Sequence, residues 1–267
     1  MKHPTINQLT SFFAHLGVSH GDLLLIHSDI RLLGMVENGL AGILTALRTA
    51  VGDEGTLVMP TFTFSFCRGE VFDVQRTPSG TGVLTEALRT KPDAFRSVHA
   101  NHSFAAIGLR AREVLTMTDK SSFGPGSVFR NFLRKKAKIL LIGTFVNSFV
   151  HFVEQKVGVE YRYNKDFHGI VCDKGREYED TFTMYVRRQD LEGTEEEDRK
   201  LAREAFFDSK ACRGELFQYG VHRLFWAHDY CDFLMDKLVK DPLYLVDKKK
   251  YFASAASLRQ RPNGPST

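Results

Sequence analysis

The sequence predicts an α/β fold: a three-layer α/β/α sandwich with a mainly parallel central sheet and a C-terminal hairpin and helix elaboration. Three short apolar runs, 23–27, 56–59 and 138–142, are typical of strands buried on both faces. Two segments with apolar residues at helical spacing, 5–16 and 39–51, alternate with the first two runs. Such alternation of helices and buried strands predicts parallel strand pairing.

Further elements continue this pattern along the chain. Residues 82–90 and 128–133 have the character of helices, 103–107 that of a strand, and the glycine-rich stretch 123–127 that of a loop. In open α/β sheets, ligands bind outside the carboxyl ends of the strands. We therefore expect the polar residues that follow the three buried strands to converge on one site.

The character of the sequence changes after residue 169. Two extended runs, 170–172 and 181–186, flank a turn and predict an antiparallel hairpin. The elements expected after it, as a substrate-side cap, are a charged helix at 194–206, a strand at 215–219 and an amphipathic helix at 228–239.

A single domain over residues 1–253 accounts for these elements. Its core is expected at about 5–168 and its C-terminal elaboration at about 169–253. The remaining residues, 254–267, have a polar, turn-forming composition that predicts a flexible tail.

Composition excludes several classes of protein. The chain has 36 basic and 32 acidic residues, with only short basic runs, so we expect no nucleic-acid partner. Its four cysteines are scattered and read as reduced thiols. No long apolar stretch occurs, so we expect a soluble, cytoplasmic protein with no membrane insertion. The aromatic-rich C-terminal part fits either a core or an interface, which leaves a homodimer possible.

Six separated motifs resemble, in order, those of the aminoglycoside 3-N-acetyltransferase family. The resemblance covers roughly residues 5 to 170, and the C-terminal hundred residues match only loosely. The motifs lie at 21–28, at 55–63 (GTLVMPTFT), at 80–89 (GTGVLTEALR), at 96–108 (RSVHANHSFAAIG), at 123–127 (FGPGS) and at 147–154.

The resemblance implies an enzyme that transfers an acyl group directly from acetyl-CoA, or another acyl-CoA, to the amine of an amino sugar, without a metal. Such a reaction needs a base that titrates near neutral pH, and histidine fits best. His151 is the expected base, and Glu154 lies three residues on, where it can orient the imidazole. Spacing alone favours a surface helical pair, and the resemblance to the family reverses that preference. A metal site lacks further ligands.

Other site residues are assigned by position and motif. Thr61 follows the second strand and is the expected donor to the thioester oxygen, although a turn residue that bonds only its own backbone fits too. The expected cofactor-binding residues are His27, Ser28, Arg31, His102 and Ser103, and the expected substrate-binding residues are Thr63, Asn147, Tyr161 and Arg162.

The acceptor is inferred from charge. A net charge of +4 argues against a polycationic acceptor, and residues 161–167 mix aromatic and basic side chains. We therefore expect a nucleotide-linked amino sugar destined for a surface polysaccharide. The alternative is an aminoglycoside, acetylated as a mechanism of antibiotic resistance. A further alternative is a non-catalytic CoA- or sugar-binding module. A hydrolase is disfavoured because no GxSxG motif occurs.

Overall fold

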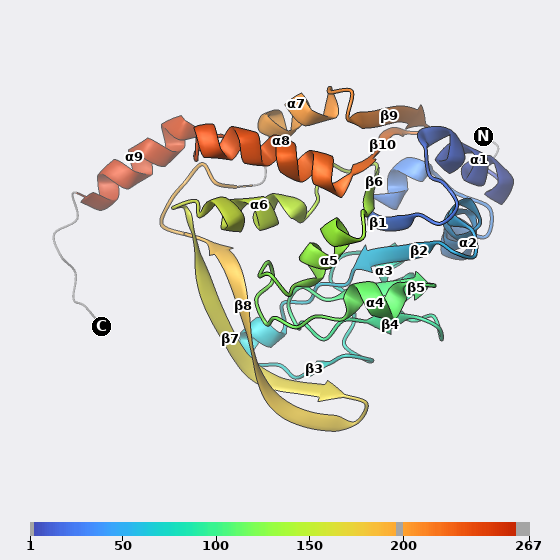
Figure 1. The fold of residues 1–267 in the computed structure, drawn as a ribbon, viewed down its shortest axis with the longest axis horizontal. Helices are drawn as coiled ribbons and strands as arrows, with labels where there is room; N and C mark the ends of the chain where they lie inside the picture. The colour runs from blue at the N-terminus through green and yellow to red at the C-terminus, as the bar shows by residue number, and fades with distance from the viewer. Residues whose placement is uncertain (1–2, 196–199, 260–267) are drawn as a thin grey trace.

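A seven-stranded sheet forms the centre of the molecule in the computed structural model, which describes residues 3–195 and 200–259. Its strand order is β4-β5-β2-β1-β6-β10-β9 (Figure 1). Only the three central strands pair in parallel: β1 (Leu23–Ser28) lies between β2 (Thr56–Pro60) and β6 (Lys138–Ile142). The α/β class is confirmed, with antiparallel strands added on both sides of this parallel centre: β4 (Phe95–Arg96), β5 (Phe104–Gly108), β9 (Cys212–Phe217) and β10 (Gly220–Trp226).

Helices cover both faces of this sheet because alternate side chains of each strand point to opposite sides. Leu24 and Ile26 of β1 pack with the helices of one face: α1 (Ile6–Leu16), α2 (Gly39–Val51) and α3 (Val83–Arg89). Leu23 and Leu25 belong to the core on the other face, with α4 (Ala111–Leu115), α5 (Val128–Arg134), α6 (Phe149–Val157) and α8 (Ala227–Lys240). The expected three layers are therefore present.

Local signals set the ends of the early helices. Thr5 caps α1, and its hydroxyl accepts a hydrogen bond from the backbone N–H of Gln8, whose side chain bonds back to Thr5. The helix ends at Gly17, whose φ of 111° lies in the left-handed region that glycine adopts without strain. Two short 3₁₀ turns follow strands β1 and β2 beyond their carboxyl ends: η1 (Ile30–Leu33) and η2 (Phe66–Arg68).

A second sheet is built on a long hairpin that runs down from α6 past β3 (Figure 1). Its strands are β3 (Phe72–Asp73), β7 (Arg162–Asp173) and β8 (Arg176–Arg187). The hairpin is much longer than predicted, because its polar, solvent-facing part carries too few apolar residues to signal a strand. As a result, β7 runs across the boundary expected at residue 169.

The C-terminal part extends the main sheet, and the substrate-side role expected for residues 169–253 stays a prediction. After α7 (Lys200–Phe207), β9 and β10 pair with each other, and β10 pairs with β6. A final helix, α9 (Lys248–Arg259), occupies the first residues of the predicted flexible tail. Residues 260–267 lie outside the described part. Within residues 3–195 and 200–259, no helix combines the length and the apolar character that crossing a bilayer requires.

Candidate active site

Helix α6 and the start of β7 bring a histidine, a glutamate, a tyrosine and an arginine together near the carboxyl ends of the parallel strands. Nδ1 of His151 lies 2.8 Å from Oε2 of Glu154. The hydroxyl of Tyr161 donates to the other carboxylate oxygen, Oε1, at 2.9 Å. Nε of Arg162 lies 2.7 Å from Oε2 in an ion pair. The predicted pairing of His151 with Glu154 is confirmed.

Burial distinguishes this pair from a surface helical pair. The side chain of Glu154 has no exposed area, whereas 23% of the His151 side chain is exposed. A buried carboxylate is costly unless donors surround it, and the donors from Tyr161 and Arg162 compensate for that cost. Glu154 is therefore a fixed anion behind a ring that reaches the surface of the site.

The contact through Nδ1 also fixes which nitrogen of His151 acts. A neutral imidazole that donates its Nδ1 proton to a carboxylate keeps the lone pair on Nε2. Nε2 is then the basic atom, and Glu154 stabilises the ring once it is protonated. This is the arrangement that a general base requires.

The short turn between α6 and β7 positions the glutamate next to its two donors. Gly158 ends α6 with a φ of 78°, and only four residues separate the helix from β7. The guanidinium of Arg162 also donates to the carbonyl of Tyr185 on β8 at 3.1 Å. The hydroxyl of Tyr185 in turn donates to the carbonyl of Val159 at 2.7 Å. The hairpin thereby anchors the charged group.

An aromatic wall connects this group to a second histidine. The ring of Phe123 lies 6.2 Å from that of His151 and 5.3 Å from that of His102. Phe62 packs against His102 from another side at 4.7 Å. Burial holds the pKa of His102 well below its usual range, and the charges of His99, His151 and Arg162 lower it further.

A cavity of about 1070 Å³ opens beside Arg162, between the hairpin and the segment around η2. Phe64, one of its walls, also lies against His102, with ring centroids 6.3 Å apart. The volume suits a ligand larger than a single sugar ring. The residues that line it are Phe64, Cys67, Glu160, Arg162, Tyr163, Lys165, Phe167, Met184, Val186, Arg187, Arg188, Gln189 and Asp190.

The charge of this cavity is more balanced than its composition suggests. Each of its three arginines has a carboxylate partner: Arg162 pairs with Glu154, Arg187 with Glu195, and Arg188 with Asp190 at 2.7 Å. Cationic charges compensated in this way attract an anionic ligand much less than isolated ones do.

Thr61 belongs to a sealed polar network, which argues against its expected role as an oxyanion donor. Its side chain is fully buried, 3.1 Å from the hydroxyl of Ser103, and it accepts a hydrogen bond from Nε of Arg96 at 3.2 Å. The Ser103 hydroxyl donates to the carbonyl of Thr61 at 2.7 Å. The Thr61 proton therefore goes to Ser103, and none is left for a substrate.

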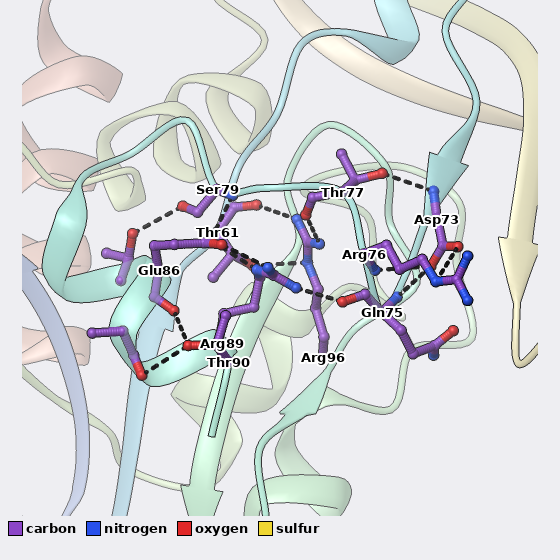
Figure 2. A network of polar contacts seen from close by, with 12 residues as sticks. Thr61, Asp73, Gln75, Arg76, Thr77, Ser79, Glu86, Arg89, Thr90 and Arg96 are labelled. Carbon is purple, nitrogen blue, oxygen red and sulfur yellow. Dashed lines mark hydrogen bonds and ion pairs between the residues drawn. The ribbon is translucent and has the colours of Figure 1, made fainter. Parts of the chain in front are cut away.

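Arg96 is the centre of that network (Figure 2). Its other nitrogens donate to the carbonyls of Thr61, Val74 and Thr77, and its guanidinium lies over the ring of Phe72. Burial lowers the pKa of Arg96 to about 10, so it stays protonated at neutral pH. Arg96 therefore joins the loops that follow β2 and β3, and Thr61 and Ser103 hold it in place.

The predicted cofactor residues do not form one cluster. His27 is 8% exposed, and no described residue bonds its buried Nε2; burial lowers its pKa to about 4. Ser28 is half-buried, and Arg31 extends into solvent in an ion pair with Asp29. Within the described chain, no contact joins these residues to His102 or Ser103. They stay predictions.

The predicted substrate residues have mixed outcomes. Tyr161 is fully buried and its hydroxyl donates to Glu154, so its predicted contact with a substrate stays a prediction. The hydroxyl of Thr63 donates only to Ser65, at 3.3 Å. Asn147 precedes α6 and is 1% exposed; its Oδ1 accepts from the N–H of Phe149, while its Nδ2 has no partner in the described structure. Asn147 thus retains donor capacity one helical turn before the histidine.

The sequence profile of the family described as aminoglycoside 3-N-acetyltransferase matches residues 25–239, which is most of the chain. The chain belongs to the aminoglycoside 3-N-acetyltransferase family. Aminoglycoside N(3)-acetyltransferase III of Serratia marcescens is 32% identical to it over 174 residues. That match covers 56% of this chain and 64% of the relative, so it spans less than two thirds of the relative's length.

Solved structures related to the aminoglycoside 3-N-acetyltransferase family share the fold over nearly their whole length. AAC-IIIb in a binary complex with CoASH superposes with a TM-score of 0.79 at 21% identity, covering 90% of this chain and 97% of that one. AAC-VIa bound to sisomicin superposes with a TM-score of 0.77 at 22% identity, covering 89% and 98%. These comparisons favour the aminoglycoside alternative, and none supports a nucleotide-linked sugar.

Some residues of the site were missed by the sequence analysis. The cavity-lining residues Phe64 and Cys67 come from the segment around η2, and Ser122 bonds the ring of His102 at 2.7 Å. They lie 20 or more residues away in sequence from the partners they meet, and no local pattern marks such contacts.

Proposed function

We propose that the protein is an acetyl-CoA-dependent N-acetyltransferase that modifies an amino group of an aminoglycoside, with His151 as the general base. The observation that carries this proposal is the 2.8 Å contact between Nδ1 of His151 and the fully buried carboxylate of Glu154. A surface ion pair would not be sealed in this way. Membership of the aminoglycoside 3-N-acetyltransferase family supports the reaction and its acceptor.

The chemistry follows from this arrangement. Nε2 of His151 takes a proton from the acceptor's ammonium group, and the freed amine attacks the thioester carbonyl. The carbon–nitrogen bond forms as the carbon–sulfur bond breaks. The nitrogen then loses a second proton to become an amide, the leaving CoA thiolate takes up one proton, and one proton is released to solvent overall. Glu154 stabilises the imidazolium while it exists. A direct transfer of this kind needs no covalent acyl-enzyme.

The thioester oxygen gains negative charge during the attack and needs a donor. Thr61 has no proton left for it, whereas Asn147 has an Nδ2 group without a described partner, and its orientation is set by its bond to Phe149. We propose Asn147 for this role, which requires the site to open over Nδ2 when the thioester binds, because that atom is buried in this structure. Asn147 lies two residues before the start of α6 and four before His151.

An aminoglycoside is favoured over a nucleotide-linked sugar for a physical reason as well. The three cavity arginines are neutralised by carboxylates, and the remaining cation of the lining, Lys165, is offset by Glu160. The net charge of the whole chain therefore says little about this cavity. AAC-VIa, which shares the fold, has been solved bound to sisomicin, an acceptor that can be tested directly.

The test is release of free CoA thiol from acetyl-CoA in the presence of two acceptor panels, aminoglycosides including sisomicin, and nucleotide-linked amino sugars. Turnover with the aminoglycosides is expected. Turnover confined to the nucleotide sugars would replace the proposed acceptor. Silence with both panels, at normal CoA binding, would reject the proposed acceptor class.

The matched control variant is His168→Ala. His168, like His151, has a ring nitrogen close to an oxygen, 2.7 Å from the hydroxyl of Thr181, but it lies on the outer part of the hairpin, away from Glu154. Its loss should leave turnover unchanged, whereas His151→Ala should abolish most of it.

A further inference from the structure

Two buried histidines share one serine hydroxyl behind the aromatic wall of the site. Nδ1 of His102 lies 2.7 Å from Oγ of Ser122, and Nε2 of His99 lies 3.2 Å from the same oxygen. The backbone N–H of His102 donates to Nδ1 of His99 at 3.2 Å. The Ser122 hydroxyl donates to the carbonyl of Thr183 at 3.1 Å. These four contacts allow every proton to be assigned.

The assignment begins with His99. Its Nδ1 accepts a hydrogen bond, so the single proton of the neutral ring is on Nε2, which donates to Ser122. Burial, the largest cause, lowers the pKa of His99 to about 3, in keeping with a neutral ring. The one hydroxyl proton of Ser122 goes to Thr183. Nδ1 of His102 must then donate to Ser122, because that oxygen has no second proton to give.

Nε2 of His102 consequently carries a lone pair. Within the described residues nothing hydrogen-bonds this atom, and it is not sealed from solvent as Nε2 of His27 is. The ring of His102 shares Phe123 as a neighbour with His151, and it also lies against Phe64, a wall of the cavity. The site therefore contains an uncharged acceptor in addition to the base His151.

We infer that His102 is an acceptor-binding residue of the site: its Nε2 accepts an N–H of the incoming amino group and, together with His151, aims that nitrogen at the thioester. This inference deepens the proposed function and rests on it. An ammonium group has three N–H bonds, so one can go to each histidine. Two acceptors fix the direction of the nitrogen where one would leave it free to rotate.

The difference between the two rings lies in their partners. His151 has a carboxylate behind it and can hold a proton, whereas His102 has a serine hydroxyl and a second neutral histidine behind it. His102 therefore binds without competing for the proton that His151 removes. The inference places His102 on the acceptor side, whereas the sequence predicted a cofactor-binding residue; that prediction is not tested by the structure.

The proton assignment can be measured without any acceptor. Protein labelled with ¹⁵N-histidine should show His102 with its proton on Nδ1 and a lone pair on Nε2 from pH 6 to pH 8. The His102→Asn variant identifies the resonance by its loss. A proton on Nε2, or a doubly protonated ring, would overturn the inference.

Binding of the acceptor by His102 is tested by two substitutions, one that keeps a polar group at the position of Nδ1 and one that keeps it at the position of Nε2. In His102→Asn the amide can still donate to Ser122 but leaves no acceptor at the position of Nε2, whereas His102→Gln places an oxygen near that position. We expect the Asn variant to raise the KM for sisomicin about tenfold, the effect of one lost hydrogen bond. The KM for acetyl-CoA should not change, and the Gln variant should recover much of the loss.

His168→Asn is the matched control and should change neither constant. A rise in the KM for acetyl-CoA, or no rescue by Gln, would overturn acceptor binding by His102. If the unmodified protein acetylates neither sisomicin nor any other amine, the proposed function fails. The histidine spectra then decide the proton assignment on their own.

Discussion

Two buried arginines show how differently this protein uses the same side chain. Arg162 has a carboxylate 2.7 Å away and lines an open cavity, whereas the hydrogen bonds of Arg96 go to carbonyls and hydroxyls within a sealed network (Figure 2). Both guanidiniums are nearly buried, with side-chain exposures below one tenth. We propose that the first group supports chemistry; in the second, the cation Arg96 is held by uncharged partners and joins the loops around it.

The comparison teaches that burial of a polar group is not by itself a mark of function. What separates the two groups is the exposure of the side chain predicted to act: the ring of His151 is 23% exposed, while Thr61, which bonds Arg96 in the other network, has no exposed area. If this distinction is correct, substitutions in the two groups should have opposite effects on stability and turnover.

The largest expected effect is on stability. Arg96→Met removes the donors of three buried carbonyls, so we expect the free energy of unfolding to fall by more than about 3 kcal/mol. Chemical denaturation monitored by circular dichroism measures it. Arg89→Met, which removes a more open ion pair with Glu86, serves as the control and should cost less. Equal losses would contradict the special position of Arg96.

The next effect is on turnover. His151→Ala should lower kcat about a hundredfold or more, equivalent to about 2.7 kcal/mol of activation free energy, while the free energy of unfolding changes little. Thiol release under saturating substrates provides the measurement. A variant with full activity would show that the Glu154 group is a structural network like that of Arg96.

Acid should lower the free energy of unfolding, because the buried ring of His27 stays neutral in the folded protein. Burial lowers the pKa of His27 to about 4 in the folded state, against about 6.5 when unfolded. Between these values the unfolded chain binds a proton that the folded chain does not, so stability is complete above pH 6.5 and falls as the pH falls. From pH 7 to pH 5 the loss from this residue is about 2 kcal/mol.

This loss should disappear in His27→Gln, whatever the absolute stability of that variant. Denaturation series at pH 7, 6 and 5 give the slope, and His168→Gln, at an exposed position, should keep the slope of the unmodified chain. An unchanged slope in His27→Gln would mean that His27 is not buried as a neutral group.

The smallest effect separates two roles for Thr61. Thr61→Val removes one hydroxyl from the sealed network and should cost about 1 kcal/mol of stability. Turnover should stay within about twofold, whereas loss of an oxyanion donor costs about a hundredfold. A large fall in kcat at normal stability would return Thr61 to the active site and place its network on the catalytic side of the comparison.

The sequence predicted the elements whose patterns are local. The helix over 39–51 and the strand over 138–142 have the predicted bounds, and those of the first helix and the first two strands are right to within one residue. Strand β10 was missed because His222 and Arg223 interrupt its apolar character. Nε2 of His222 lies 3.0 Å from the carbonyl oxygen of Phe217, while its buried Nδ1 has no partner among the described residues. The guanidinium of Arg223 lies over the rings of Phe145 and Phe207.

The site was predictable where motif and spacing agree. His151 and Glu154 are three residues apart on one helix, and the structure joins them. Thr61 was correctly placed at a strand end, but its burial depends on Arg96, which lies 35 residues later. The charge of the cavity was misjudged because a net charge averages over the chain, whereas each cavity arginine is paired with its own carboxylate.

The short connection between α6 and β7 has a consequence for how this family can diversify. The base and the carboxylate lie on the helix, and the wall of the cavity continues directly from it along β7. Side chains further along that strand, such as Tyr163, Lys165 and Phe167, face the cavity without touching Glu154. Mutation at these positions can change which amine is accepted while the reaction itself is inherited intact.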